Sequence, residues 1–279
     1  NLDFSNPVNG QLNDISGNAN HFYLNGNFEL DSDVPDSMTE PQNLNHSLSF
    51  GGNSSNDFVL IDNYQADQIS TGITITAWVN INLEDDNHHT IIFNGCCGTD
   101  NTWYWGLVLR EYGGAWGIQP TVYLQTDQTN NGAGYFPPAG IGSILPNSGW
   151  QHVAMTWSEN LLNIYLNGEN VHTEQVNGNF IQGSNDLIIG GWNNGNNNAE
   201  GSFNGLLDEV TVYSIALSQE QIQGSMNTEL FGMEEGLVAY WNFNEGEGTV
   251  LEDLTANSND GNINSATWSD DGAPVMPAS

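Results

Sequence analysis

Aromatic side chains gather around the chain's single basic residue between positions 101 and 117 (NTWYWGLVLREYGGAWG). Sugar-binding sites commonly place flat aromatic rings against a sugar and use a few polar groups for its hydroxyls. The candidate ligand-binding residues in this segment are Trp103, Trp105, Arg110, Tyr112 and Trp116. A strand here would instead turn half of its side chains toward a core, and its alternation would bury Trp103 and Trp105 together. Both interpretations, a sugar site and core packing, stay open.

Arg110 and Trp192 widen this candidate site. Arg110 is the only Lys or Arg in 279 residues, and a guanidinium serves either as the partner of an acidic neighbour or as the contact for an acidic ligand. Trp192 stands in the Asn-rich segment GWNNGNNN (191–198), which suits the rim of a binding site and equally suits a soluble turn.

An oxygen-rich turn near the N-terminus is a candidate cation site. Its side chains, at every second position, are those of Asp14, Ser16, Asn18 and Asn20. Calcium prefers about six to eight oxygen ligands from carboxylates, amides and backbone carbonyls, and this turn offers several. The alternative is an Asx-type turn with solvated side chains. A weaker candidate is the predicted loop with Asp85, Asp86, His88 and His89, which is either a metal site or a solvated loop.

The charge balance excludes two classes of partner. The chain has 34 acidic residues against one basic residue, a formal net charge of −33. Nucleic-acid binding depends on basic residues that neutralise phosphates, and an anionic membrane surface would repel this chain. No apolar run of about 18 residues predicts a membrane span. No signal peptide is visible at Asn1, so we expect a mature fragment or a piece of something longer.

The elements that must position these residues are short strands. Apolar residues alternate with polar ones between Gly and Asn turns, a pattern typical of half-buried strands. Such runs lie at 74–81, 104–109, 121–125, 151–157, 161–166, 186–190 and 207–213. Many short strands at this spacing predict an all-β sandwich.

Two local signals are specific enough to place a turn and a helix. Asn167-Gly168 predicts a hairpin, because both central positions of a type I′ turn need a positive φ. Ser218 and Gln221 have the spacing of a capping box, which predicts one short helix over 218–224 with Ile222 as its buried residue.

Six segments carry a family resemblance. They are SLSFGGNSSNDFVLI (47–61), ITITAWVNI (73–81), GWQHVAMTW (149–157), LNIYLNGENV (162–171), LIIGGW (187–192) and FNGLLDEVTVYSIALSQEQI (203–222). In this order they resemble the laminin-G-like domains of the concanavalin A-like lectin/glucanase superfamily. The resemblance implies a two-sheet antiparallel jelly-roll sandwich over residues 1–225. It also implies that the concave sheet or its rim loops bind carbohydrate.

The resemblance further implies a structural calcium between the opening turn and the Asp of the last core strand. The implied metal ligands are Asp14, Asn18, Asn20 and Asp208.

The superfamily also contains glycoside hydrolases, in which two carboxyl groups must face each other across the substrate. Its glucanases carry the pattern E-x-D-x-x-E on one strand. Here Glu29, Asp31 and Asp33 alternate, but the run continues into Val34-Pro35 without a third acid at that spacing. The sequence contains no G-x-S-x-G and no zinc signature. We therefore expect no catalytic residues and a protein that is not an enzyme.

The two ends of the chain resemble each other when one is shifted by 239 positions. The identical pairs are Phe4/Phe243, Leu12/Leu251, Asp14/Asp253, Asn18/Asn257, Asn20/Asn259 and Asn25/Asn264. We therefore expect 226–236 to be a connector. Residues 237–279 are expected to be the opening strand and turn of a second laminin-G-like repeat, or a strand-donating tail. The alternative is an extension that reuses a similar turn.

The segment LVAYWNFNEGEG, from residue 237, has the alternation of a strand. Left alone, it would expose unpaired backbone groups and bare aromatic rings. We expect it to lie beside the closing strand around Val210–Tyr213, in its own molecule or in a neighbour.

These observations favour a non-catalytic, calcium-stabilised carbohydrate-binding or adhesion module of a larger surface protein, extracellular or at the cell surface. Its expected partners are glycans and neighbouring repeats or copies of itself. The alternatives are a structural repeat of an extracellular filament that assembles by strand exchange, and a glycoside hydrolase of the same superfamily.

Overall fold

The structure, a computed structural model, is built almost entirely of strands. It describes residues 2–8, 11–14, 22–23, 45–52, 55–62, 64, 69, 71–82, 88–95, 103–111, 118–129, 133–138, 140–183, 186–193, 199–200 and 202–278. By its contacts the chain divides into two compact units, Asn1–Asn43 and Leu44–Ser279. Within the described residues no helix is long and apolar enough to cross a membrane.

The larger unit contains two eight-stranded antiparallel sheets. In spatial order, sheet I consists of β10 (Gly134–Tyr135), β9 (Ile118–Leu124), β8 (Trp103–Glu111), β7 (His88–Gly95), β14 (Leu187–Ile189), β5 (Phe58–Ile61), β20 (Gly261–Asn264) and β19 (Val250–Leu251). Sheet II consists of β13 (Glu169–Gln175), β12 (Leu161–Leu166), β11 (Gln151–Ser158), β6 (Gly72–Ile81), β17 (Asn204–Tyr213), β4 (Ser47–Gly51) and β21 (Thr267–Ser269), with β18 (Leu237–Trp241) also paired to β17. A small ribbon joins β15 (Trp192–Asn193) and β16 (Ala199–Glu200).

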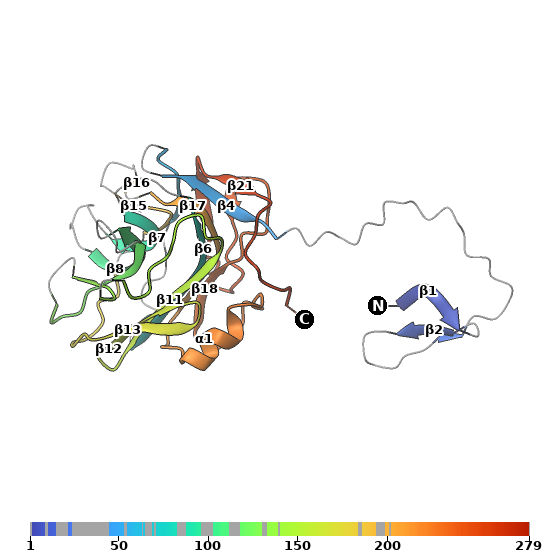
Figure 1. The fold of residues 1–279 in the computed structure, drawn as a ribbon, viewed down its shortest axis with the longest axis horizontal. Helices are drawn as coiled ribbons and strands as arrows, with labels where there is room; N and C mark the ends of the chain where they lie inside the picture. Colours follow the sequence, from blue (N-terminus) through green and yellow to red (C-terminus); the bar gives the residue numbers. More distant parts are fainter. Residues whose placement is uncertain are drawn as a thin grey trace. The chain divides into compact units, whose positions relative to one another are not determined.

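The two sheets enclose one main apolar core. On β6, Ile75, Ala77 and Val79 are fully buried in it, as the alternation predicts. On β8, Trp105, Leu107 and Leu109 point into the same core from the opposite sheet. The predicted two-sheet antiparallel jelly-roll sandwich is confirmed (Figure 1).

Both local predictions are confirmed. Asn167 and Gly168 have φ of 51° and 78°, and they join β12 to β13 in a two-residue turn. Helix α1 (Gln219–Ser225) begins after Ser218, whose side chain accepts the N–H of Gln221 in a complete capping box. Its buried residue, Ile222, packs beside sheet II, where Figure 1 shows the helix.

The C-terminal segment completes the sandwich within its own chain. Strand β18 pairs with β17, so that Val210 faces Trp241 and Thr211 faces Tyr240. The predicted place of this strand is therefore confirmed. Strands β20 and β21 add to β5 and β4. Because these pairings tie residues 237–269 into the sandwich, the predicted boundaries at 225 and 237 do not coincide with the division into units.

The smaller unit is a three-stranded antiparallel sheet of β1 (Leu2–Val8), β2 (Gln11–Asp14) and β3 (Phe22–Tyr23). In it, Gln11 lies opposite Tyr23 and Leu12 lies opposite Phe22.

Candidate functional site

The outer face of sheet I, opposite the core, carries the residues best suited to hold a ligand. Residues directly opposite each other on neighbouring strands share a face. Three rows cross β7, β8 and β9 on this face: His88–Arg110–Gln119, Thr90–Val108–Thr121 and Phe93–Gly106–Tyr123. The first two rows are mainly polar, and within them only His88 and Arg110 are partly exposed, because Thr90, Val108, Gln119 and Thr121 are buried. The third row is aromatic.

Trp103 and Trp192 extend the aromatic row into a cluster with Phe93 and Tyr123, here called the aromatic cluster. The ring centres of Trp103 and Tyr123 lie 5.1 Å apart, and those of Trp103 and Trp192 lie 6.2 Å apart. Phe93 and Tyr123 are buried, whereas the two tryptophans are only partly buried. The tryptophans therefore keep ring surface available above a packed base.

Gly106 makes this packing possible. A side chain at this position would begin 2.4 Å from Cδ2 of Phe93 and 2.9 Å from the carbonyl oxygen of Ile92. The missing side chain lets the Phe93 ring approach β8 closely, where it meets Trp103 edge to face at 5.8 Å.

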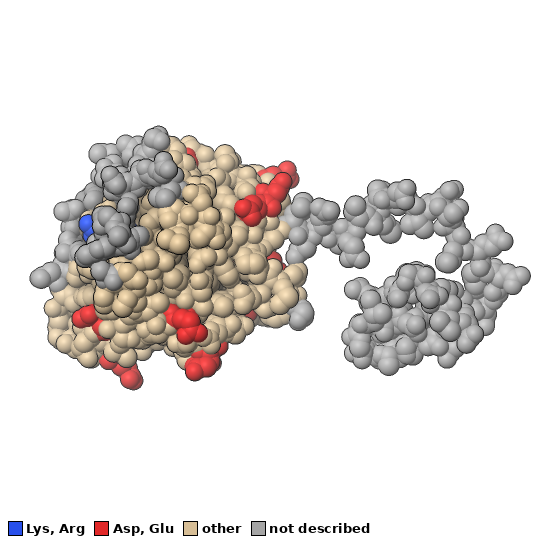
Figure 2. Space-filling model, viewed as in Figure 1, with Lys and Arg blue, Asp and Glu red and all other residues tan. Residues whose placement is uncertain are grey.

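A polar group borders the aromatic cluster. His88 meets the ring of Trp192 at 5.2 Å and lies opposite Arg110. Burial, with the nearby charges of Arg110 and His89, lowers the pKa of His88 to about 4, so the imidazole is neutral at pH 7. Figure 2 shows acidic side chains scattered over the surface and basic atoms at one place, which belong to Arg110 because the chain has no other Lys or Arg.

The structure separates the two tryptophans that the sequence placed together. Trp105 is fully buried in the main core, where its Nε1–H donates to the carbonyl of Gln182 at 3.3 Å. It is therefore removed from the candidate ligand contacts. The ladder of β7 and β8 shifts register between Asn94 and Gly95, which places Trp103 on the outer face instead. Trp103, Arg110 and Trp192 stay in the site, whereas Tyr112 and Trp116 lie outside the described residues.

Sequence reasoning missed Phe93, Tyr123 and the role of His88. Each sits in an ordinary strand pattern, and only the side-by-side order of β7, β8 and β9 brings them to one face. His88 and His89 were expected in a loop, but they begin β7 because their backbone pairs with Arg110 and Leu109. His89 is buried on the other side, against Phe203. Asp85 and Asp86 lie outside the described residues.

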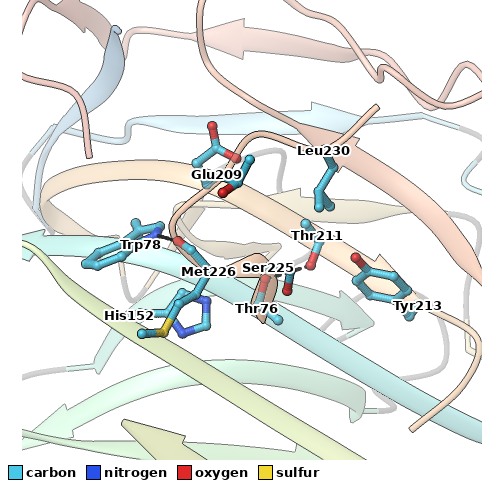
Figure 3. Close-up of a pocket in the computed structure, with 10 residues that line it drawn as sticks. Thr76, Trp78, His152, Glu209, Thr211, Tyr213, Ser225, Met226 and Leu230 are labelled. Carbon is cyan, nitrogen blue, oxygen red and sulfur yellow. Dashed lines mark hydrogen bonds between the residues drawn. The ribbon is translucent and has the colours of Figure 1, made fainter. Parts of the chain in front are cut away.

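A second hollow lies on the outer side of sheet II (Figure 3). It contains about 290 Å³ of space, partly open to solvent, and is lined by Thr76, Trp78, His152, Glu209, Thr211, Tyr213, Ser225, Met226, Thr228 and Leu230. Part of this space is open solvent, so the enclosed hollow is much smaller than an ordinary ligand pocket of about 300–1,000 Å³. Its walls are tied together by Trp78, which donates to the carbonyl of Met226 at 2.7 Å. It suits water or a very small ligand better than a glycan.

Asp208, a predicted calcium ligand, precedes Glu209 of this hollow and is held by the backbone. It is fully buried, and its two oxygens accept N–H groups from Glu209 and Ala273, each at 2.8 Å. Burial, together with the nearby Glu209, raises the pKa of Asp208 well above its usual range. The part of Asp208 in calcium binding stays a prediction.

The other predicted calcium ligands are not placed by the structure. Asn18, Asn20 and the side chain of Asp14 lie outside the described residues. Within the described part of the chain, no group of three or more His, Cys, Asp or Glu residues could hold a metal ion. Calcium binding at the N-terminal turn stays a prediction.

Comparison with known families fits this sandwich. The model of the concanavalin A-like lectin/glucanases superfamily matches residues 53–223, which is more than half of the chain. The chain belongs to the concanavalin A-like lectin/glucanases superfamily. The matched segment begins shortly before β5, ends within helix α1 and contains all of β7, β8 and β9. No curated protein matches the chain.

The chain is similar to several solved structures. A candidate carbohydrate-binding protein from Bacteroides ovatus has 23% identity and a TM-score of 0.61 over 83% of this chain and 61% of its own. The CBM40 of a Ruminococcus gnavus sialidase, bound to α2,3-sialyllactose, has 14% identity and a TM-score of 0.48 over 64% and 94%. The NanB sialidase of Streptococcus pneumoniae has 15% identity and a TM-score of 0.50 over 67% and 29%. The chain thus spans about three fifths of the Bacteroides ovatus structure, and at these identities the likeness shows the fold alone.

Proposed function

We propose that this protein is a non-catalytic carbohydrate-binding module whose ligand lies on the outer face of β7, β8 and β9. The observation that carries the proposal is the pair of partly buried tryptophans, Trp103 and Trp192, held over a buried aromatic base beside Arg110 and His88. The superfamily membership and the carbohydrate-binding description of the Bacteroides ovatus protein support it.

Each part of the face has a chemical role in this proposal. The rings of Trp103 and Trp192 offer apolar surface to the C–H groups of a sugar. Arg110 supplies several N–H donors, and the neutral imidazole of His88 supplies one donor and one acceptor for hydroxyl groups. The described residues of this face thus offer ring surface and hydrogen-bonding groups, a chemistry that suits sugar binding.

Tryptophan fluorescence titrations with a panel of neutral and acidic oligosaccharides test this function. We expect a glycan of the panel to shift the emission, and Trp103→Ala and Trp192→Ala each to weaken its binding at least tenfold, which is about 1.4 kcal/mol. Trp150→Ala is the matched control, because Trp150 is a partly exposed tryptophan just before β11 of the other sheet, and it donates to Asp271. A panel without any response, or equal weakening in the Trp150 variant, would contradict the proposal.

The setting of the module is a further part of the proposal. We propose an extracellular or cell-surface location, because a chain with one basic residue offers almost no cleavage sites to trypsin-like proteases and its charge suits salty surroundings. Fractionation of the cells that produce the natural protein tests this location, by detecting the protein in the medium, at the cell surface or inside the cell. The filament alternative would require copies to exchange strands, whereas β18 pairs inside its own chain.

A further inference from the structure

The two ends of the chain share one antiparallel strand pairing. Gln11 pairs with Tyr23 and Leu12 with Phe22 in the smaller unit. A shift of 239 positions turns these pairs into Val250 with Asn262 and Leu251 with Gly261, which are the pairs that join β19 to β20. The repeat that the sequence shows is therefore also a repeat of backbone pairing. We call residues 2–25 the N-terminal copy and residues 241–264 the C-terminal copy.

The identities between the copies follow the burial of the C-terminal copy. From 250 to 260, the exposed residues alternate with buried or half-buried ones. The exposed residues are Val250, Glu252, Leu254, Ala256, Ser258 and Asp260, and none is identical in the N-terminal copy. The intervening residues are Leu251, Asp253, Thr255, Asn257 and Asn259, of which four are identical and Thr255 is replaced by Ser16. The copies thus share the side that packs against the sandwich.

Asp253 shows what the shared polar residues do. Its Oδ1 accepts the N–H groups of Tyr240 at 3.1 Å and Thr255 at 2.9 Å. Its Oδ2 accepts the Thr255 hydroxyl at 2.9 Å and the Asn259 N–H and Nδ2 at 2.8 and 3.0 Å. The carboxylate therefore ties the turn to β18 without needing a cation.

The other identical residues also face the sandwich. Phe243 and Leu251 are fully buried in the main core. Nδ2 of Asn257 donates to the carbonyl of Val238 at 2.8 Å. Nδ2 of Asn264 reaches the larger unit's own backbone, at the carbonyl of Asn56, 3.1 Å away.

We infer that the N-terminal copy is a second occupant of the position that the C-terminal copy holds against β5 and β17 of the same chain. We call this position the opening slot. There is one such slot, whereas the chain carries two segments whose inward-facing residues match it. When the N-terminal copy enters the slot, it takes the register of its counterpart, so Tyr23 lies opposite Leu60 of β5, as Asn262 does now.

The connecting chain is long enough for this exchange. The N-terminal copy ends at Asn25, and β4 begins at Ser47. In the occupied slot, the counterpart Asn264 is only five residues before Ser269, which pairs with Ser47. Five residues span at most about 18 Å, whereas the 21 residues between Asn25 and Ser47 reach about 70 Å when extended.

Two residue differences and one additional strand explain why the C-terminal copy holds the slot here. Gly261 is Phe22 in the N-terminal copy, and a side chain at 261 would begin 2.4 Å from Cγ1 of Val59, so Val59 must move. Trp241, fully buried, is Leu2, which fills less of the core. The C-terminal copy also brings β18, whose residues 237–239 have no counterpart among the 279 residues.

Disulfide trapping in the full chain tests the exchange, with Cys96 and Cys97 replaced by Ser. Tyr23→Cys with Leu60→Cys reports the N-terminal copy in the slot, and Asn262→Cys with Leu60→Cys reports the C-terminal copy. Leu24→Cys with Leu60→Cys is the matched control, because a one-residue shift turns the side chain to the opposite face. We expect an intrachain disulfide for the first two pairs, with the Tyr23 pair at least several-fold above the Leu24 pair.

The balance between the copies gives a second readout. Asp253→Ala should raise the yield of the Tyr23 disulfide and lower that of the Asn262 disulfide, whereas Asp14→Ala should lower the Tyr23 yield alone. A Tyr23 yield no higher than the Leu24 yield, or a disulfide formed only between chains, would overturn the inference. The trapping in the otherwise unchanged chain decides the question even if the Asp253 variant does not fold.

Discussion

The hydroxyl of Tyr240 donates a 2.6 Å hydrogen bond to Oε2 of Glu209, which joins the C-terminal strand β18 to β17 inside the protein. Glu209 sits at a bulge with a φ of 53°, an uncommon conformation for a residue with a side chain. The bulge sends its carboxyl group into the hollow of sheet II, where Oε1 has no hydrogen-bond partner among the described residues.

The raised pKa of Glu209 predicts that the folded protein loses stability as the pH rises. Burial raises its pKa from 4.5 to about 8, although the hydrogen bond from Tyr240 acts in the opposite direction. Between these values the folded state binds the extra proton, so its contribution is complete below pH 4.5 and is lost as the pH approaches 8. At about 1.4 kcal/mol for each pKa unit, the loss amounts to a few kcal/mol. Urea denaturation between pH 5 and about 8.5 measures it.

Glu209→Gln is the control for this effect, because the amide keeps the shape and cannot ionise. We expect the variant to show a clearly flatter pH profile over that interval, with a remaining slope from Asp208, whose pKa is also raised. Acidification acts through other groups, since burial lowers the pKa of His152 to about 3 and so destabilises the fold as the pH falls below 6.5. Parallel profiles of the two proteins would contradict the role given to Glu209.

Local sequence signals predicted the strands, the turn and the helix of the sandwich. The Asn167-Gly168 turn and the Ser218 cap depend on neighbours within a few residues, so sequence alone could place them. The place of β18 could be predicted because a segment with three large aromatic side chains, Tyr240, Trp241 and Phe243, needs a partner.

The ligand face depends on relationships that sequence alone does not carry. Phe93, Gly106 and Tyr123 form one row only because β7, β8 and β9 are neighbours in sheet I. Likewise, strict alternation places Trp103 and Trp105 on one side, and only the register shift beside Gly95 separates them. Irregular steps in a ladder arise from packing across the sheet, so a single strand's pattern cannot predict them.

The two tryptophans of β8 are expected to respond differently to truncation. Trp105→Ala removes a fully buried ring that meets Tyr64 edge to face at 5.9 Å, and such losses cost about 3–5 kcal/mol. Trp103→Ala removes a partly buried ring on the outer face, so we expect a smaller loss of stability together with a loss of glycan binding. Denaturation midpoints and fluorescence titrations on both variants measure the contrast. Equal destabilisation would show that Trp103 serves only packing.

Gly106→Ala should damage the ligand face without touching any ligand-contacting side chain. The new methyl group would press on the Phe93 ring and the backbone of Ile92, which forces the aromatic cluster apart. Overpacking of this kind costs about 1–3 kcal/mol, and we expect weaker near-ultraviolet circular dichroism and weaker glycan binding.

The matched control for this substitution is Gly224→Ala, because a side chain at Gly224 in α1 meets nothing within 4 Å. Alanine is also the better helix former, so this variant should be at least as stable as the parent protein. If Gly106→Ala behaved like Gly224→Ala in both spectra and binding, the packing role of Gly106 would be wrong.

Calcium binding by the N-terminal turn is tested by melting the protein in calcium and in a chelator. A ligand at a hundredfold excess over its Kd stabilises the native state by about 2.7 kcal/mol, so the predicted site should raise the Tm by several degrees.

Asp14→Ala should abolish this shift. Asp208→Asn should reduce it if Asp208 is the fourth ligand, and should leave it unchanged if the two oxygens serve only the backbone N–H groups of Glu209 and Ala273. Asp253→Ala is the matched control in the second copy of the turn. Its carboxylate serves hydrogen bonds alone, so its Tm should fall equally with and without calcium. Identical curves for the unaltered protein in both buffers would mean that the first turn, like the second, is held by hydrogen bonds and needs no cation.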